Sequence, residues 1–257
     1  MPTSLLCLSI LSLLVLHGLP QTFALFASSP VKLYTHPKTR SALVAWYLTE
    51  LNVPFEEQYV AVEKQEQKSA DFLALNPFGQ LPVLQTKEGK TIFESGAILL
   101  YLSETYGELK GKSATDRADI AKWIFFANAS LSNKVLQGAG RSGSPGWKIA
   151  MASSLNALEQ QLGKSTTGYL LGTADVTAAD IAVASLLLYT PVFHEGKYSL
   201  LKGYPNVVDY MELMATRPAY AQAYGQDRLS IVQDGLEGYR NPLKPRPRKK
   251  GGGWKLF

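Results

Sequence analysis

The chain has 257 residues, 46% of them hydrophobic and 18% charged. This is enough apolar material for one large domain or two small ones, and it excludes a disordered or collagen-like chain. The formal net charge at pH 7 is +5, but residues 240–257 hold seven basic and no acidic side chains. Because residues 1–30 hold no charged side chain, subtracting those seven charges leaves −2 for residues 31–239. The basic character belongs to the C-terminal end, and we expect no nucleic-acid-binding face on the folded part.

Residues 1–30 have the character of a cleaved targeting leader. Residues 5–16 form an apolar run that is shorter than the ~20 residues needed to span a bilayer, so we expect no stable membrane span. Small residues at Thr22 and Ala24 favour cleavage after Ala24, which predicts entry into the secretory pathway through an N-terminal signal. The whole leader resembles the two-part leaders of algae with complex plastids. Delivery to such a plastid and secretion or residence in the endoplasmic reticulum therefore both stay open, and a cytoplasmic chain is the alternative.

Cysteine and histidine are scarce, and this excludes several kinds of site. The single cysteine, Cys7, lies in the leader, so the rest of the chain cannot form a disulfide, a CxxC redox pair or a cysteine nucleophile. The three histidines, His17, His36 and His194, are too few and too scattered to indicate a zinc site or a nucleophile with its imidazole base. We expect no bound metal.

Residues 31–106 are predicted to form an α/β domain. Its elements in chain order are a strand at 31–35, a helix at 41–51, a strand at 55–60, a short helical segment at 69–75, an apolar run at 81–84, a hairpin turn at 87–90, a strand at 91–93 and a helix from Glu94-Ser95 to about Tyr106. The order βαβ followed by ββα is that of a thioredoxin-like sheet, and the right-handed crossover rule makes the first two strands parallel. Pro82 interrupts its apolar run, which indicates an edge, a bend or a cis bond that leaves backbone groups free to pair.

Residues 115–225 are predicted to form an all-α helical bundle domain, joined to the first domain by a linker at 107–114. Long helices are expected at 116–136 and 147–162, separated by a glycine-rich break at 138–146, and a third helix starts at Ala178. Thr177 and Asp180 have the spacing of a capping box, so Asp180 is predicted to be structural, with a cost of about 0.5–2 kcal/mol on its replacement. Residues 226–257 are predicted to be a basic, mostly disordered tail, on the Pro- and Gly-rich composition of its end.

The residues at the start of the helix predicted from Glu94-Ser95 suit an amino-acid ligand. A helix N-terminus at Ser95 offers unpaired N–H groups and the positive end of the helix dipole to a carboxylate. Glu94 can accept hydrogen bonds from an ammonium group, so the pair can recognise both charges of an α-amino acid. The alternative is that Ser95 is only an N-cap and Glu94 a solvated acid.

Two segments separated by 11 residues carry a family resemblance. Asn76-Pro77-Phe78-Gly79-Gln80-Leu81-Pro82 and Glu94-Ser95-Gly96-Ala97-Ile98 resemble the two signature segments of the glutathione transferase N-terminal domain. The resemblance covers residues 31–224, and residues 40–48 and 123–129 are most similar to the chi-type class of cyanobacteria. It implies a glutathione-binding thioredoxin-like domain followed by a helical domain, a homodimer, and an acceptor site near Trp123, Phe126 and Ser130.

The resemblance also implies how glutathione is held. A cis bond between Leu81 and Pro82 would turn the Leu81 N–H and C=O outward, toward the cysteinyl unit of the tripeptide. Gln80 would join Glu94 and Ser95 at the γ-glutamyl end. Lys68 would meet the glycyl carboxylate, and a solvated lysine is the alternative for it.

Conjugation requires the glutathione thiolate, and a free thiol with a pKa near 8.5 is mostly protonated at neutral pH. In the family, a Tyr, Ser or Cys near the first helix donates a hydrogen bond to the sulfur. Here Thr35 stands where a catalytic Tyr would, so Thr39 and Ser41 are the candidate donors, with Arg40 as an electrostatic aid. The alternative is that Thr39 or Ser41 simply caps the first helix.

Three functions are therefore weighed. The first is a glutathione S-transferase that joins the glutathione thiolate to small hydrophobic electrophiles by nucleophilic substitution or addition. The second is a non-catalytic binding or assembly module with the same fold. The third is a cysteine-independent glutathione peroxidase-like activity, whereas disulfide or dehydroascorbate reduction is disfavoured because no cysteine remains to form a mixed disulfide.

Overall fold

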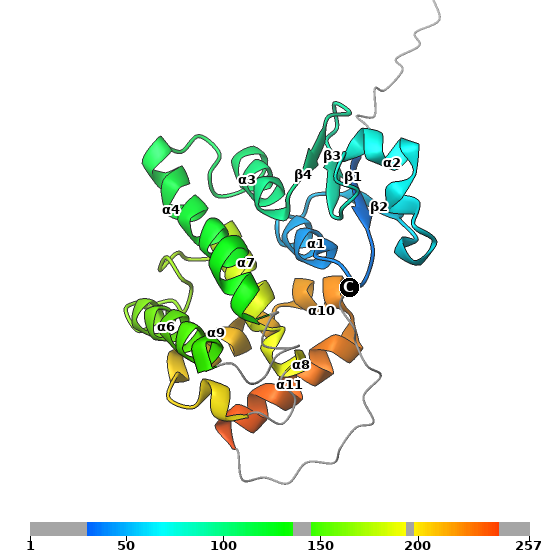
Figure 1. Ribbon diagram of the computed structural model, residues 1–257. Helices are drawn as coiled ribbons and strands as arrows, with labels where there is room; N and C mark the ends of the chain where they lie inside the picture. Colours follow the sequence, from blue (N-terminus) through cyan, green and yellow to red (C-terminus); the bar gives the residue numbers. More distant parts are fainter. Residues whose placement is uncertain (1–29, 136–144, 194–197, 242–257) are drawn as a thin grey trace, which may run out of the picture.

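The computed structural model describes residues 30–135, 145–193 and 198–241. The predicted leader, the predicted glycine-rich break and the chain beyond residue 241 therefore lie largely outside the described residues. An α/β layer and a helical layer pack side by side (Figure 1), which confirms the predicted fold class.

The first domain contains one four-stranded sheet with the strand order β2-β1-β3-β4. Its elements are β1 (Val31–Thr35), α1 (Ser41–Glu50), β2 (Phe55–Tyr59), the 3-10 turns η1 (Val62–Lys64) and η2 (Glu66–Lys68), α2 (Ala70–Leu75), β3 (Val83–Gln85), β4 (Thr91–Phe93) and α3 (Ser95–Thr105). β1 pairs in parallel with β2, while β3 is antiparallel to both β1 and β4. The predicted parallel pairing of the first two strands is confirmed.

Alternating side chains place a different core on each face of this sheet. Leu33 and Leu84 are register partners, both fully buried, in the core that α1 and α3 share with the helical domain. Tyr34 and Val83, the next pair along, belong to a smaller cluster around Phe72 of α2. Because neighbouring residues of a strand point to opposite faces, a slip of one residue would exchange the two cores, and this fixes the register.

The second domain is helical throughout the described residues. Its elements are α4 (Ala114–Phe125), the π-helix η3 (Phe126–Leu131), α6 (Pro145–Leu162), α7 (Ala178–Leu187), α8 (Thr190–Phe193), the 3-10 helix η4 (Tyr198–Leu201), α9 (Pro205–Ala215), α10 (Pro218–Tyr224) and α11 (Gln226–Arg240). Every residue of α7 is buried, and Thr177 and Asp180 form the predicted capping box at its start. None of the described helices is both long and apolar enough to cross a membrane.

The prediction of a tail from residue 226 is wrong for residues 226–240, which form α11. Leu229, Val232 and Leu236 recur at helical spacing on its inner side, and Val232 and Leu236 are buried in the main core. Gly235 allows close packing, because a Cβ there would lie 2.4 Å from the Cβ of Pro191 in α8. The prediction took the composition of the chain beyond this helix as the guide to the whole segment, and it therefore placed the start of the tail too early in the chain.

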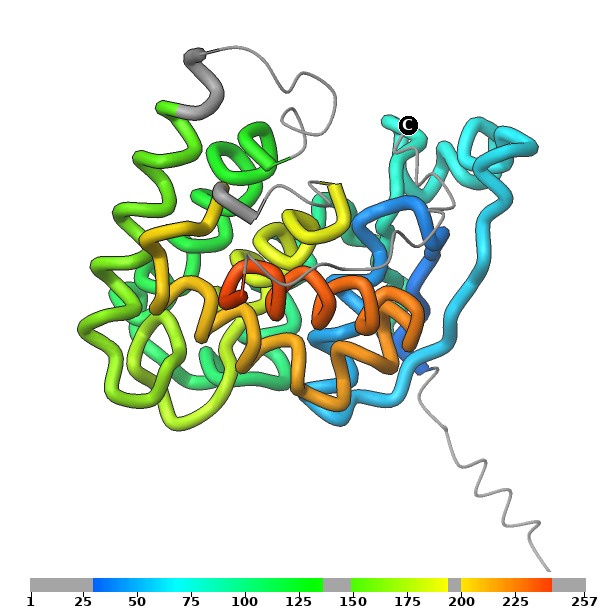
Figure 2. The backbone as a smooth tube through the Cα atoms, turned by 90° about the horizontal axis from the view of Figure 1, so that it is seen from below, coloured from blue at the N-terminus to red at the C-terminus, as the bar shows by residue number. Residues whose placement is uncertain are grey.

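The two domains meet along α1. In Figure 2, α10 runs beside this helix, and Trp46 of α1 packs edge-on against Tyr220 at 5.0 Å and Tyr224 at 6.0 Å between ring centroids. Arg217, just before α10, donates two hydrogen bonds to the carboxylate of Glu50 at 2.7 and 2.8 Å. The helix that follows the first strand is therefore fixed by the second domain as well as by its own sheet.

Candidate functional site

The predicted site residues stand at one end of the sheet because of its topology. β1 ends at Thr35, β3 begins at Val83, and β4 ends at Phe93. The register pairs Tyr34 with Val83 and Val83 with Phe93, so the loop after β1, the segment before β3 and the start of α3 lie next to one another. Sequence reasoning named residues in each of these segments, and the fold brings them to a common edge.

The loop between β1 and α1 holds its hydroxyl groups in a short chain. The Thr39 hydroxyl donates to the carbonyl of His36 at 2.8 Å and lies 2.7 Å from the Ser41 hydroxyl. Since a threonine hydroxyl has one proton, Ser41 is the donor in the second contact. Ser41 is fully buried, whereas Thr39 is partly exposed, so Thr39 is the hydroxyl that a ligand can reach.

The alternative in which Thr39 or Ser41 caps the first helix is wrong. The N-cap of α1 is Arg40, and no side chain makes a capping hydrogen bond there. The N–H of Ser41 does donate to the Thr39 hydroxyl at 3.4 Å, but Thr39 stands before the N-cap, and no capping bond to the later N–H groups of the first turn is present among the described residues. This leaves the positive end of α1 directed at the same region as the two hydroxyl groups.

Arg40 extends from this loop to the second domain, where its Nη2 donates to Oδ1 of Asn128 at 2.6 Å. The Nε of Arg40 is buried and has no hydrogen-bond partner within the described part of the chain. Burial lowers the pKa of Arg40, while the nearby Tyr224, Tyr189 and Glu94 act in the opposite direction. The guanidinium is therefore held by a neutral amide, and its positive charge is not cancelled by a direct carboxylate partner.

The start of α3 has an unusual backbone. Glu94 is the N-cap residue, with φ of 68° and ψ of 116°, and its side chain is exposed and makes no capping hydrogen bond. Ser95 is the first helical residue and is 5% exposed, so the alternative in which Ser95 is the N-cap is wrong. A positive φ at a residue other than glycine costs about 1–3 kcal/mol and is typical of functional sites.

The segment before β3 is shaped by Asn76 and Gly79. The buried Asn76 side chain donates to the carbonyl of Gln80 at 2.8 Å and accepts from the N–H of Phe78 at 3.1 Å. Gly79 has φ of 60°, and a Cβ there would lie 2.6 Å from the carbonyl oxygen of Gln67. This position therefore requires glycine.

The peptide bond between Leu81 and Pro82 is cis, as predicted. Neither the N–H nor the C=O of Leu81 has a backbone hydrogen-bond partner among the described residues. Both groups lie just outside the strand ladder, where an extended peptide can pair with them. Lys68 lies along the same segment, its ammonium group donating to the carbonyl of Phe78 at 3.0 Å, and its side chain is exposed.

Sequence reasoning missed two residues that hold this site. His36 was not among the predicted site residues; it is buried, its Nδ1 accepts from the N–H of Lys38 at 3.1 Å, and its Nε2 lies 3.3 Å from the carboxylate of Glu63. It thereby anchors the loop that carries Thr39. Asn128 was missed although it is a polar residue within an apolar stretch, which was the one available signal.

Aromatic side chains of the second domain lie close to Arg40. Tyr189 and Phe193 stack at 5.2 Å between ring centroids, and the guanidinium of Arg228 lies 4.2 Å from the centre of the Tyr189 ring. The expected acceptor residues Trp123 and Phe126 are partly buried against the main core and pack edge-on at 5.7 Å.

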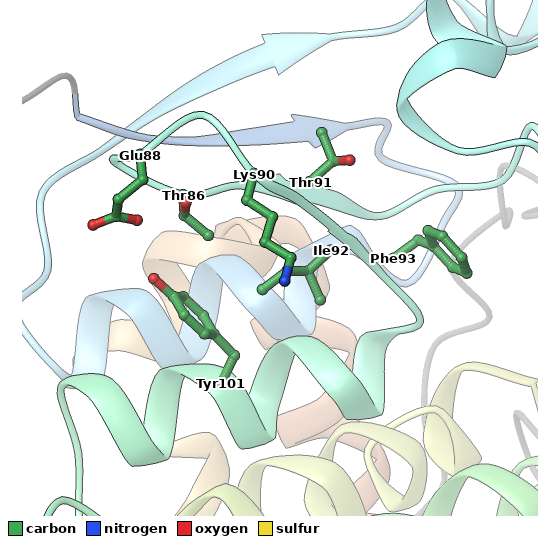
Figure 3. Close-up of a pocket in the computed structure, with 7 residues that line it drawn as sticks. All are labelled: Thr86, Glu88, Lys90, Thr91, Ile92, Phe93 and Tyr101. Carbon is green, nitrogen blue, oxygen red and sulfur yellow. The ribbon is translucent and has the colours of Figure 1, made fainter.

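A separate open pocket of about 530 Å³ lies between the β3–β4 hairpin and α3 (Figure 3). It is lined by Thr86, Glu88, Lys90, Thr91, Ile92, Phe93 and Tyr101. It contains none of the predicted site residues. Within the described ranges, no group of three or more His, Cys, Asp or Glu side chains is placed to hold a metal ion.

The chain is similar to known proteins in both of its domains. Two family models match the chain, one described as the glutathione S-transferase N-terminal domain over residues 29–104 and one as the glutathione S-transferase C-terminal domain over residues 133–213. A glutathione S-transferase-like protein, OpS6, of Beauveria bassiana is 31% identical over 208 residues, which cover 74% of this chain and 92% of that protein.

Two further similarities differ in what they cover. A probable elongation factor 1-gamma of Arabidopsis thaliana is 29% identical over 238 residues, which are 85% of this chain but 55% of that protein, so the chain spans about half the length of this relative. The solved structure of a glutathione transferase from Burkholderia graminis, with two glutathione molecules bound per subunit, is 25% identical with a TM-score of 0.66 and covers 77% of this chain and 88% of that one.

Proposed function

The chain belongs to the glutathione S-transferase family, and from that premise we propose that it binds glutathione as the thiolate and conjugates it to small hydrophobic electrophiles. One observation carries the proposal. Unpaired backbone at Leu81, the strained start of α3 at Glu94 and the hydroxyl and guanidinium groups of the β1–α1 loop stand at one end of a single sheet. These are the groups needed for the backbone, the amino-acid end and the thiol of one tripeptide.

In this proposal the tripeptide lies along the segment before β3. Leu81 pairs with the cysteinyl unit through its N–H and C=O, in the manner of an added strand. The γ-glutamyl carboxylate takes the N–H groups at Ser95, and its ammonium group takes Glu94 and Gln80. Lys68 has two further N–H donors beyond the one bound to Phe78, and it attracts the glycyl carboxylate.

We assign the thiol-activating hydrogen bond to Thr39. Its partial exposure supports this assignment, as does the fully buried Ser41 behind it, which can donate to Thr39 while Thr39 turns its own proton from His36 to the sulfur. Ser41 then positions Thr39, and Arg40 and the N-terminus of α1 add positive potential. Thr39, Arg40 and the N-terminus of α1 each lower the pKa of the bound thiol, because each favours its charged form.

The chemical step forms one carbon–sulfur bond. In a substitution, the thiolate attacks an electrophilic carbon and the leaving group departs with the bonding electron pair. In an addition, the attacked double bond keeps the electrons and takes a proton from water. The chain has only to supply the thiolate and to hold it in the orientation that leads to attack on the electrophile. None of its own residues therefore needs to become covalently modified.

Calorimetry and thiol titration test the proposal together. Glutathione should bind with measurable heat, and the ultraviolet absorbance of its thiolate should appear in the complex at a lower pH than in free glutathione. The analogue carrying serine in place of the cysteinyl unit is the matched control, since it fills the same site without a thiol. No heat with glutathione, or a thiol pKa equal to that of free glutathione, would remove the transferase proposal.

A non-catalytic binding module is the second candidate, and one observation favours it. Both hydroxyl protons of the β1–α1 loop are already engaged within the protein, and a relative named probable elongation factor 1-gamma is 29% identical over 85% of this chain. Binding of glutathione without any lowering of its thiol pKa would select this candidate.

A peroxidase-like reaction uses the same thiolate as conjugation. The two activities are distinguished by supplying a hydroperoxide and measuring oxidised glutathione.

We also propose a homodimer, a chi-type subclass and targeting by residues 1–30. The exposed aromatic side chains Phe78 and Phe125, 62% and 61% exposed, support the dimer. The similarity of residues 40–48 to chi-type sequences supports the subclass. The apolar run in the leader supports entry into the secretory pathway, with a complex plastid or secretion as the destination, and fluorescence from a fused reporter would distinguish these from a cytoplasmic chain.

A further inference from the structure

We propose that Asn128 is a positioning residue, contributed by the second domain, that holds Arg40 beside the thiol end of the site while leaving the positive charge of Arg40 uncompensated. This inference rests on the proposed function and deepens it, because it identifies how the helical domain contributes to ionisation of the bound sulfur. Its basis is one side chain that contacts two parts of the thioredoxin-like domain at once.

The local backbone explains how Asn128 reaches Arg40. Asn128 lies in the π-helix η3, Phe126–Leu131, which continues directly from α4. A π-turn widens the helix by one residue and re-aims the side chains around it, and such turns are frequent at functional sites. From here the Asn128 amide oxygen accepts from Arg40 Nη2 at 2.6 Å across 88 positions of sequence.

The same amide also contacts the first turn of α3. A Cβ built on Gly96 would lie 2.6 Å from Nδ2 of Asn128 and 2.9 Å from Ile124. Gly96 follows Ser95, the residue proposed to bind the γ-glutamyl carboxylate. Asn128 therefore joins the N-cap of α1 to the N-terminus of α3, and both helix ends face the ligand in the proposed function.

An amide is the chemically appropriate group for this task. It fixes the guanidinium through a hydrogen bond but carries no charge, so the field of Arg40 at a nearby sulfur is preserved. The other groups that influence the Arg40 charge are Glu94 before α3, Tyr189 before α8 and Tyr224 at the end of α10. Of these only Glu94 is a carboxylic side chain, and it is exposed.

A carboxylate in the place of Asn128 would have the opposite effect. It would hold Arg40 equally well, or better, but would cancel much of its positive charge. A charge within about 4–6 Å of a titrating group shifts the pKa of that group by about one unit or more. Asn128→Asp should therefore retain the fold and the position of Arg40 while raising the pKa of the bound thiol.

The experiment compares thiol titrations in the glutathione complexes of the full-length native chain and four full-length variants. Asn128→Asp should raise the bound-thiol pKa by about one unit, which reduces the thiolate about tenfold at a pH below both values. Asn133→Asp is the matched control, because Asn133 is exposed two residues beyond the same π-helix, and it should leave the titration unchanged. Asn128→Ala removes the anchor without adding charge and should raise the thiol pKa toward the value measured for Arg40→Met.

The outcomes separate the inference from the function on which it rests. Absence of glutathione binding by the native chain would overturn both. Binding with a lowered thiol pKa in the native chain, but no change in Asn128→Asp and Asn128→Ala, would overturn the role of Asn128 alone. Thermal melting identifies a variant that does not fold. The folded Asn128→Ala variant decides, because a merely structural asparagine would leave its thiol titration unchanged, whereas a carboxylate at this position raises the thiol pKa by its own charge. If Asn128→Ala does not fold, an unchanged thiol pKa in Arg40→Met would overturn the role of Asn128, which acts through Arg40.

Discussion

Replacing Asp180 should destabilise the protein far more than the loss of an ordinary helix cap. Its carboxylate is fully buried and accepts hydrogen bonds from the N–H of Leu170 at 2.9 Å, the N–H of Thr177 at 3.0 Å and the hydroxyl of Thr177 at 2.7 Å. A buried donor that loses its partner costs about 1–3 kcal/mol. With two backbone N–H groups and one hydroxyl affected, we expect Asp180→Ala to lower the free energy of unfolding by about 3–6 kcal/mol.

Equilibrium urea denaturation measures this loss, and the chain supplies its own control. Asp116 forms the same capping box with Ser113 at the start of α4, accepting from its N–H at 3.0 Å and its hydroxyl at 2.8 Å, but both residues are exposed. Water can replace a lost carboxylate there, so Asp116→Ala should move the denaturation midpoint much less. Equal shifts for the two variants would refute the reasoning, since burial would then not determine the cost. The folded fraction of either variant should bind glutathione as the native chain does.

Three further predictions test the site itself. Thr39→Val should raise the bound-thiol pKa and lower kcat/KM by about 10²-fold in a pH–rate profile. Ser41→Ala should have the smaller effect on both quantities, and a larger effect of Ser41→Ala would contradict the assignment of Thr39. Glu94→Gly should stabilise the fold by about 1 kcal/mol in thermal melting, because it relieves the positive φ, yet weaken glutathione binding in calorimetry. Gly79→Ala should destabilise the fold more than Gly89→Ala, since both have positive φ but only at Gly79 would the added Cβ meet the backbone; similar losses would show that the clash is relieved.

The elements with strong local signals were predictable from sequence. The parallel start of the sheet follows from the βαβ order. A proline inside an apolar run indicated an edge, a bend or a cis bond, and the family resemblance selected the cis bond that the structure has. The start of α3 was placed correctly at Ser95. These features depend on residues within a few positions of one another, which is the range over which backbone and turn preferences act.

What the sequence could not reveal depends on distant contacts. The hydrogen bond from Arg40 to Asn128 joins residues 88 positions apart, and no local pattern indicates it. The choice between Thr39 and Ser41 depends on burial, which only the packed structure defines. The helix α11 was missed because the composition of the chain end was extended back over it, whereas its place depends on packing of Val232 and Leu236 in the main core.

The contacts along α1 explain why the helical domain matters for a site built mainly by the other domain. Near its C-terminus, α1 is held by Glu50, which accepts from Arg217 and from Trp46, and by Tyr47, whose hydroxyl donates to Glu108. Glu108 in turn accepts from the N–H of Ala178 at 2.8 Å, at the start of the buried helix α7. At its N-terminus α1 is held through Arg40 by η3. The second domain therefore fixes both ends of α1, the helix whose positive end is directed at the thiol of glutathione in the proposed function. A change in domain packing then alters the electrostatic potential at the site without a change in any residue that binds the ligand.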